Sequence, residues 1–397
     1  MERFGLKPAR LLLPTVDLPR WSVIACDQYT SEPDYWQRAE AIVGDAPSTL
    51  RITLPEIYLN DRPEQRIAAI NATMTRYLDE GVFRVCPDSL MYIERETSAG
   101  LRRGLLGVID LEEYDYRSGS HTLIRATEQT VVERIPPRVA IRRDAPLELP
   151  HVLLLTDDPA RTVIEPLAAQ KARFAPAYDF DLMLGGGHIA GWQVDAAAAQ
   201  QVDAALRALV TGQDDPLLFA VGDGNHSLAT AKECYRLSGN PLARYALVEV
   251  VNIHDPSIQF EPIYRVLFSA DAADVTAALR AASGGNAADG QAVTIVSAAG
   301  EETLSLRPTS KLPVGTLQAF LDDYLAAHPG VRIDYIHGAD TLRTLARQEG
   351  AVGFLFEGMG KSDLFPAIRA DGSLPRKTFS MGHAADKRYY LEARAIR

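Results

Sequence analysis

Apolar and polar positions alternate along this chain in a way that predicts interleaved strands and helices. Short, strongly apolar runs that predict strands occupy residues 10–13, 22–26, 50–54, 151–156, 178–184 and 245–253. Helical patterns, in which apolar residues recur every three or four positions, occupy residues 31–43, 61–81 and 195–210. Residues 82–85, 90–93 and 105–110 add strands with short links, so we expect antiparallel pairing there. The pattern predicts an α/β protein with a mixed sheet.

The most informative stretch is a predicted strand at residues 217–221 that leads through Gly-Asp-Gly into a predicted helix. Gly222 and Gly224 permit backbone angles that are closed to other residues, and Asn225 or Ser227 can cap the helix. The N–H groups at the start of such a helix point outward at its positive end. A strand, a glycine turn and a helix start together make a site for an anion, most simply a phosphate.

Two side chains add chemistry to this turn. The Asp223 carboxylate can hold Mg²⁺ or accept a proton, and the His226 imidazole can stabilise a phosphoryl group during transfer. The alternative is structural, because Asp and Asn are common in turns and caps, and His226 can be an ordinary surface residue. The Gly-Lys-Ser/Thr ending of a Walker loop is missing, and so is a dinucleotide-binding fingerprint.

Further candidate residues lie elsewhere in the chain. Two of them lie in residues 120–130. Arg125 can bind phosphate with two parallel hydrogen bonds, and Glu128 can orient the Arg125 side chain or bind a metal ion. Alternatively, Arg125 and Glu128 form an ion pair with each other. His188 follows three glycines at residues 185–187. We expect these glycines to form a flexible hairpin rather than a phosphate-binding loop. Glu249 interrupts the apolar run 245–253, and a carboxylate on a buried strand needs a partner or a chemical role.

The Gly-Asp-Gly-Asn-His-Ser turn at residues 222–227 and its helix resemble the Asp-Gly-His-His-Arg turn of domain-of-unknown-function family 1015. Three other segments resemble that family in the same order. Residues 124–130 resemble its Arg-His-Glu-x-Thr segment, residues 251–265 its Pro-Thr-His-Arg segment, and residues 374–380 its Pro-Lys-Ser-Thr-x-Phe segment. Four matches in order are far more specific than any one of them.

The turn is also similar to the phosphate-binding turn of sulfiredoxin, the ParB partition proteins and the free-serine kinases. That resemblance implies a mixed-sheet ParB/sulfiredoxin-like core with large insertions, and ADP or ATP at the turn. The implied phosphate-binding residues are Gly222, Gly224, Asn225, Ser227, Arg125, Glu128, Arg265 and Lys377. The implied Mg²⁺ ligands are Asp223 and Glu128. Because the related kinases place a catalytic acid early in the chain, Asp27 is the candidate for it and Glu32 the second.

The chain departs from the family pattern at three positions. Asn225 and Ser227 stand where a second His and an Arg are usual, and Tyr264 stands where a later His is usual. The missing Arg weakens the phosphate binding that the resemblance implies. A sulfiredoxin-like activity would need a cysteine in the turn, where Asn225 stands, so that activity is set aside.

Composition limits the remaining choices. A chain of 397 residues is long enough for more than one domain, and we predict a core at residues 1–283 and a smaller C-terminal α/β subdomain at 291–397, joined by the loop 283–290. The formal net charge of -11 argues against a nucleic-acid surface. Three widely spaced cysteines, no signal-peptide pattern and no membrane-spanning run predict a cytoplasmic protein. A homodimer is compatible with the sequence.

Two hypotheses follow for function. The first is a nucleotide-dependent phosphotransferase, similar to a small-molecule kinase, that acts on a hydroxyl-bearing metabolite. In it Asp27 takes the hydroxyl proton, while His226, Arg125 and Lys377 spread the charge of the transferring group. The second is a non-catalytic regulator that binds a nucleotide or metabolite, which the missing Arg and the replaced His suggest.

Overall fold

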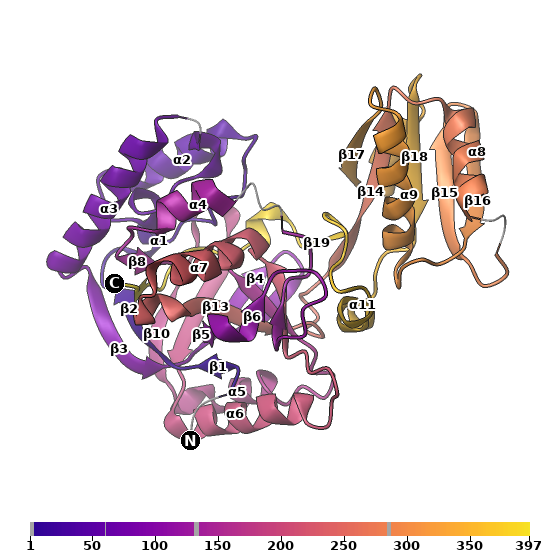
Figure 1. The fold of residues 1–397 in the computed structure, drawn as a ribbon. Coiled ribbons are helices and arrows are strands. Elements are labelled where there is room, and N and C mark those ends of the chain that lie inside the picture. The colour runs from indigo at the N-terminus through magenta and orange to yellow at the C-terminus, as the bar shows by residue number, and fades with distance from the viewer. Residues whose placement is uncertain (1–3, 60, 131–134, 284–286) are drawn as a thin grey trace. The chain divides into compact units, whose positions relative to one another are not determined.

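The computed structural model describes residues 4–59, 61–130, 135–283 and 287–397, which divide into two compact units (Figure 1). Unit 1 contains residues 1–126, 130–258 and 382–397, and unit 2 contains residues 127–129 and 259–381. This division differs from the predicted one at 283–290, of which residues 284–286 lie outside the described residues. Residues 260–268 belong to unit 2 because they form a strand inside its sheet, and the C-terminal segment returns to unit 1.

Unit 1 contains both helices and strands. Its elements are β1 (Leu6–Lys7), β2 (Ala9–Pro14), α1 (Leu18–Trp21), α2 (Pro33–Val43), α3 (Pro63–Asp79), β3 (Phe83–Ser89), β4 (Met91–Thr97), β5 (Gly100–Asp110), β6 (Tyr114–Asp115), β7 (Ile124–Arg125), α4 (Ile135–Arg142), β8 (Leu147–Glu148), β9 (Leu153–Thr156), α5 (Glu165–Gln170), β10 (Ala175–Asp181), β11 (His188–Gln193), α6 (Ala196–Val210), β12 (Phe219–Asp223), α7 (Asn225–Ser238), β13 (Tyr245–Asn252) and β20 (Arg394–Ala395).

The main sheet of unit 1 is mixed, in the order β10-β11-β4-β5-β13-β9-β12-β7-β6, with β1 paired to β5. Strand β13 is antiparallel to β5 but parallel to β9, and β12 is antiparallel to β9 but parallel to β7. The predicted mixed α/β architecture is confirmed. The antiparallel pairing of β4 with β5 and the β10–β11 hairpin around the three glycines are confirmed as well.

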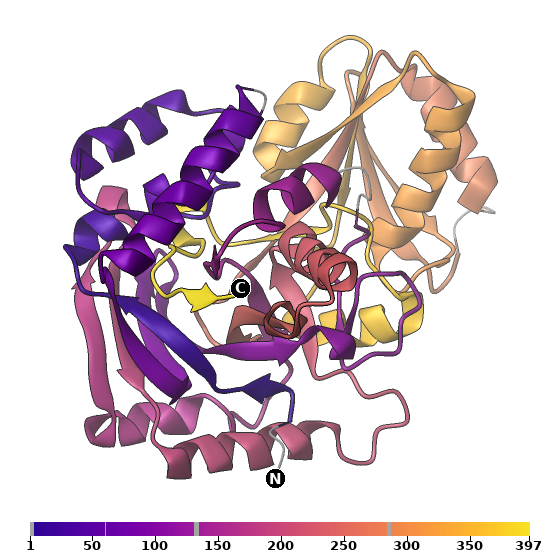
Figure 2. The same ribbon diagram turned by 60° about the vertical axis from the view of Figure 1, so that its left-hand side comes forward.

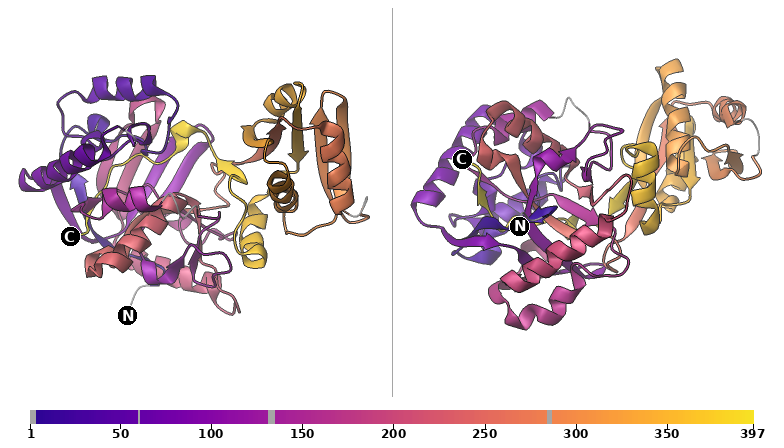
Figure 3. Two further views of the ribbon diagram at one scale, coloured as in Figure 1. Left: turned by 45° about the horizontal axis from the view of Figure 1, so that its top comes forward. Right: turned by 60° about the horizontal axis from the view of Figure 1, so that its bottom comes forward.

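Helices cover both faces of this sheet (Figures 2 and 3). On one face, Ile70 and Met74 of α3 pack in the same core as Ile93 of β4. On the other face, Val202 of α6 packs in the same core as Leu105 of β5. Because successive side chains of a strand point to opposite faces, the central strands β4, β5 and β13 contribute side chains to both cores. This explains why such strands have nearly continuous apolar sequences.

Unit 2 has its own helices and strands. They are β14 (Phe260–Phe268), α8 (Ala272–Ser283), β15 (Gln291–Ser297), β16 (Gly300–Leu306), α9 (Pro313–Ala327), β17 (Arg332–His337), α10 (Ala339–Ala346), β18 (Ala351–Phe356), α11 (Leu364–Asp371) and β19 (Phe379–Met381). The strands form an antiparallel sheet in the order β16-β15-β18-β14-β17, with β19 paired to the start of β14. The close packing of α10 on β18 depends on Gly353, where an added Cβ would lie 2.7 Å from Leu342 Cδ2.

Two predicted strands are wrong. Residues 50–54 contain a 3₁₀ turn (Thr49–Arg51), because the Ser48 hydroxyl accepts a hydrogen bond from the Leu50 N–H and so favours a turn over a strand. Residues 22–26 make a single bridge, from Ile24 to Tyr389. The predicted helices at 31–43, 61–81 and 195–210 are confirmed as α2, α3 and α6.

Hydrophobic helices of membrane-spanning length do not occur in the described part of the chain. The cytoplasmic location stays a prediction.

Candidate functional site

The predicted strand, glycine turn and helix are confirmed as β12, Gly224 and α7 in unit 1. Gly224 is the residue before the helix and has a left-handed backbone (φ 85°). A Cβ at this position would lie 3.1 Å from Val152 Cα and 3.2 Å from His151 Cδ2, so only glycine fits both the angle and the space. The predicted capping by Asn225 or Ser227 is wrong, because the N-cap position falls on Gly224, which has no side chain.

Replacing Gly224 by alanine is expected to lower the free energy of unfolding by about 1–2 kcal/mol, because an L-residue is strained at this positive φ. Contact with the backbone of Val152 adds to the cost. Urea unfolding of the variant measures the loss. Gly212 is a matched control, since it also has a positive φ (79°) but a Cβ there would meet nothing within 4 Å. Equal stability losses in the two alanine variants would contradict the importance of the close approach.

A lysine that the sequence analysis missed lies beside the turn. Lys387 Nζ is 3.4 Å from Asp223 Oδ2, and both side chains are mostly buried. The other oxygen of Asp223, Oδ1, accepts a hydrogen bond of 3.1 Å from the Gly224 N–H. The turn therefore carries a paired positive and negative charge.

Asp27 lies in the same part of unit 1. Its Oδ1 accepts a hydrogen bond of 3.0 Å from Gln28 Nε2. Burial alone would raise the pKa of Asp27, but His151, the hydrogen bond from Gln28 and Lys387 together hold that pKa below its usual value. Lys387 thus acts on both Asp27 and Asp223. The structure brings the candidate acid and the glycine turn, which are almost 200 positions apart in the chain, to one site.

A histidine, also missed, connects the Asp27 loop to α7. His151 Nε2 is 2.8 Å from Ser227 Oγ, and His151 Nδ1 is 2.9 Å from the Tyr390 hydroxyl. That hydroxyl donates to Cys26 Sγ at 3.2 Å and accepts from the Cys26 N–H. The one local signal for His151 was its position as a polar residue at the start of an apolar run. Its partners Ser227 and Tyr390 are too distant in sequence to leave such a signal.

Arg125 of unit 1 is engaged by protein groups. Its guanidinium forms two hydrogen bonds with the Asp215 carboxylate, and its Nε donates to the Thr122 carbonyl at 2.9 Å. The hydrogen bonds from Arg125 to the carboxylate lower the pKa of Asp215 to about 2. Arg125 is 2% exposed. The Arg125 guanidinium is therefore paired with Asp215 in this structure, and phosphate binding by Arg125 stays a prediction.

The remaining predicted phosphate-binding residues, Glu128, Arg265 and Lys377, belong to unit 2. Glu128 Oε1 accepts a hydrogen bond of 3.0 Å from the Lys377 N–H. Arg265 is fully buried, and burial lowers its pKa to about 10. It donates to Gln318 Oε1 at 3.0 Å and to the Lys377 carbonyl at 3.0 Å. Arg265 therefore holds the backbone of the Lys377 loop in place.

Three further residues from the sequence analysis have clear positions. His226 lies partly buried in the first turn of α7, and its carbonyl accepts a hydrogen bond of 2.7 Å from Thr230 Oγ1. Glu32 is exposed at the start of α2. His188 lies in the predicted hairpin between Asp179 and Asp181, each 2.8 Å from one ring nitrogen, and the Asp181 hydrogen bond raises its pKa.

Metal coordination at the turn would have to use few protein ligands. Within the described ranges, no group of three or more His, Cys, Asp or Glu side chains is arranged to hold a metal ion. Mg²⁺ commonly uses one or two carboxylates together with substrate phosphates and water. Asp223 fits that role; Glu128, the other predicted ligand, belongs to unit 2.

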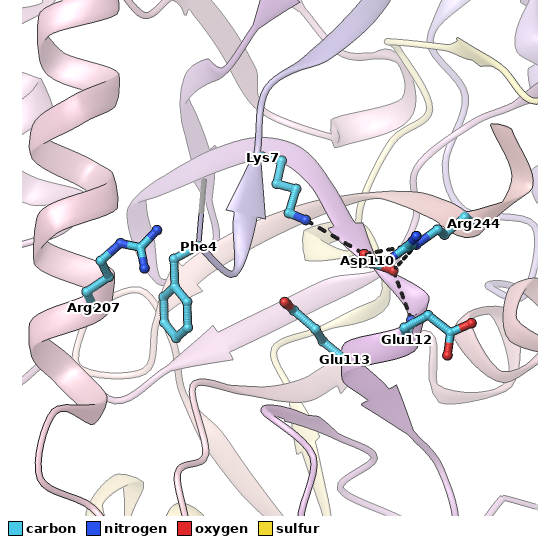
Figure 4. Close-up of a pocket in the computed structure, with 7 residues that line it drawn as sticks. All are labelled: Phe4, Lys7, Asp110, Glu112, Glu113, Arg207 and Arg244. Atoms are coloured by element: carbon cyan, nitrogen blue, oxygen red, sulfur yellow. Dashed lines mark hydrogen bonds and ion pairs between the residues drawn. The ribbon is translucent and has the colours of Figure 1, made fainter. Parts of the chain in front are cut away.

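A separate cavity of about 280 Å³ lies elsewhere in unit 1 (Figure 4). Asp110 is central to it, at 3.7 Å from Lys7 Nζ and 2.7 Å from Arg244 Nη2. The cavity is lined by Phe4, Lys7, Asp110, Glu112, Glu113, Arg207 and Arg244, none of which is a predicted site residue. The Asp110 carboxylate is thus paired with two cations inside this cavity. The cluster around the glycine turn therefore remains the candidate functional site.

Comparison with solved structures finds distant similarity. A mutant free serine kinase in complex with ADP is 11% identical, with a TM-score of 0.41, over 72% of this chain and 91% of that one. A conserved hypothetical protein from Pyrococcus furiosus is 12% identical, with a TM-score of 0.36, over 72% and 90%. C-terminally truncated SbnI from Staphylococcus aureus is 8% identical, with a TM-score of 0.36, over 70% and 82%. Similarity this distant carries no conclusion about activity.

Curated proteins gave no match. The family described as "Protein of unknown function (DUF1015)" matches residues 6–326, which is most of the chain. The match includes the glycine turn and the segments at residues 124–130 and 251–265, and it ends before the segment at 374–380. It confirms the resemblance to the family, and the protein therefore belongs to the DUF1015 family.

Proposed function

We propose that this protein is a nucleotide-dependent phosphotransferase that acts on a hydroxyl-bearing metabolite. The observation that carries the proposal is that hydrogen bonds through Tyr390 and His151 connect the Asp27 loop to α7. At the same turn, Lys387 Nζ lies 3.4 Å from Asp223 Oδ2. A base, a cation and a helix start are the groups that phosphoryl transfer requires, since its catalysis consists mainly of positioning and charge stabilisation.

Each group has a defined part in this proposal. The N–H groups at the start of α7 bind the terminal phosphates of ADP or ATP, and Gly224 lets the backbone approach them closely. Asp27 accepts the proton of the substrate hydroxyl, for which its depressed pKa keeps it ionised at neutral pH. Lys387 leaves its ion pair with Asp223 and binds the phosphates instead. Asp223 is then available to Mg²⁺, which would neutralise phosphate charge.

Nucleotide binding is expected to stabilise the protein against heat. Thermal unfolding is measured with ADP, ATP, CTP or no nucleotide, each with and without Mg²⁺. A ligand at about 100 times its Kd adds roughly 2.7 kcal/mol to the free energy of unfolding, which raises the midpoint by several degrees. Asp223→Asn should abolish the rise that depends on Mg²⁺.

The control is Asp340→Asn, which removes a fully exposed carboxylate of unit 2 and should leave the nucleotide-dependent rise unchanged. If no nucleotide raises the midpoint of the wild-type protein, the proposal is wrong. A rise that survives in both Asp223→Asn and His226→Ala would show that the nucleotide binds elsewhere.

A non-catalytic regulator is the second candidate. It is favoured by Arg125 and Arg265, which are buried and engaged by protein groups, and by Ser227 and Tyr264, which replace the Arg and His of the family pattern. Under this alternative the nucleotide-dependent rise occurs without phosphoryl transfer to any hydroxylated metabolite. Transfer to one member of a metabolite panel would exclude it.

A further inference from the structure

Ser227 and His151 form a hydrogen-bonded pair of the kind that activates a serine. Ser227 Oγ is 2.8 Å from His151 Nε2, and both residues are only partly buried. A hydroxyl is a weak nucleophile until a neighbouring base accepts its proton, and a nucleophile within hydrogen-bond distance of an oriented base is the usual arrangement. Ser227 stands where the family pattern has an Arg, so this pair is a property of this chain.

The second ring nitrogen of His151 determines which nitrogen is the base. The buried Tyr390 hydroxyl donates its single proton to Cys26 Sγ at 3.2 Å. Burial raises the pKa of Cys26 to about 12, so that the sulfur remains a neutral thiol. With the Tyr390 proton directed at Cys26 Sγ, the Tyr390 oxygen can accept from His151 Nδ1–H at 2.9 Å, in the tautomer that the proposal requires. The lone pair of Nε2 then faces Ser227 Oγ, as a general base requires.

Charge compensation for a protonated His151 is also in place. Asp27 interacts electrostatically with His151, and its carboxylate would stabilise the imidazolium that forms when the ring accepts a proton. Lys387, also close to Asp27, would counter the charge on the incoming phosphates. The cluster can thus stabilise both the positive charge on His151 and the negative charge on the phosphates during attack by the serine.

We propose that Ser227 is a nucleophile that takes the terminal phosphoryl group of the nucleotide, with His151 as its base; this inference rests on the proposed function. The bond from Ser227 Oγ to phosphorus forms, and the bond from phosphorus to the bridging oxygen of the nucleotide breaks. The serine proton moves to His151 Nε2, and the shortened nucleotide leaves with the bonding electron pair. In a second displacement the metabolite oxygen forms a bond to phosphorus, its proton goes to Asp27, and the bond from phosphorus to Ser227 Oγ breaks. Ser227 Oγ then takes back its proton from His151 Nε2.

If Ser227 forms a covalent intermediate, two signals should be measurable. The full-length protein is incubated with Mg²⁺ and either ATP or ADP, each radiolabelled on its terminal phosphate, without any acceptor. Phosphoserine at position 227 should accumulate. In a second reaction with unlabelled ATP or ADP, the shortened nucleotide, labelled in its adenosine, should exchange that label into the longer nucleotide. Ser227→Ala should abolish both signals, and His151→Gln should slow both about 10²- to 10⁴-fold, the usual contribution of a general base.

The matched control is Ser238→Ala, which removes an exposed hydroxyl from the last turn of the same helix and should leave both signals intact. Thermal unfolding of all variants establishes that they are folded. A nucleotide-dependent rise in midpoint together with transfer to a metabolite, but without phosphoserine or exchange, would overturn the covalent step and leave the proposed function standing. The absence of any such rise would overturn both.

Discussion

Replacing Asp27 by asparagine is expected to lower kcat for phosphoryl transfer about 10²- to 10⁴-fold, because the amide cannot accept the proton of the substrate hydroxyl. The depressed pKa of Asp27 means that the wild-type carboxylate is ionised at neutral pH, so the substitution removes a working base. KM for the nucleotide should change little, since the phosphates bind at the start of α7. Steady-state kinetics on the metabolite that accepts phosphate measures both constants.

Glu32→Gln is the discriminating comparison for this prediction. Glu32 is exposed at the start of α2, where its negative charge interacts favourably with the positive end of the helix. Its replacement should change kcat by less than about twofold, the effect of a surface charge whose contacts are worth a fraction of a kcal/mol. A large loss in Glu32→Gln with little change in Asp27→Asn would assign the proton acceptor to Glu32 instead.

Replacing Arg388 by methionine is expected to lower the free energy of unfolding at pH 7 by about 3–5 kcal/mol, because it leaves buried carboxylates without their partner. Arg388 binds Glu249 and, at 2.5 Å, Glu392, and all three side chains are at most 2% exposed. Burial alone would raise the pKa of Glu249, but Arg388, Arg102 and Arg95 hold it below its usual value. Urea unfolding measures the loss.

The loss in Arg388→Met should depend on pH. Because the folded pKa of Glu249 is depressed, its contribution is complete above the unfolded value of about 4.3 and is lost as pH falls through the folded pKa. Without Arg388 the pKa of Glu249 rises, so the difference from wild type should shrink below about pH 5. Arg343→Met, which breaks an exposed pair with Glu301, is the control and should cost at most about 1 kcal/mol. Equal losses in the two variants would contradict the account.

The local parts of the fold and site could be predicted because they depend on neighbouring residues. The apolar run, the two glycines and the helical pattern after them are contiguous, and the structure contains the strand, turn and helix they predict. The 50–54 strand failed because the Ser48 hydroxyl competes for a backbone N–H, an interaction that an apolar pattern does not include.

The parts that could not be predicted depend on contacts between distant residues. The sequence showed that Glu249 needs a partner, but Arg388 lies 139 positions away and no periodicity connects the two. Tyr390 and Lys387 belong to the C-terminal segment that returns to unit 1, and His151 lies 76 positions before its partner Ser227. The domain boundary differed from expectation because β14 pairs with β17 and β18, which lie after the predicted linker.

A crystal structure of the protein with ADP and Mg²⁺ tests the central claim most directly. The account predicts phosphate oxygens within hydrogen-bond distance of the backbone N–H groups that begin α7, with Lys387 turned from Asp223 toward the phosphates. ADP bound instead in the cavity beside Arg207 and Arg244 (Figure 4), or no bound ADP at a concentration far above the Kd measured in solution, would contradict the assignment of the glycine turn as the nucleotide site.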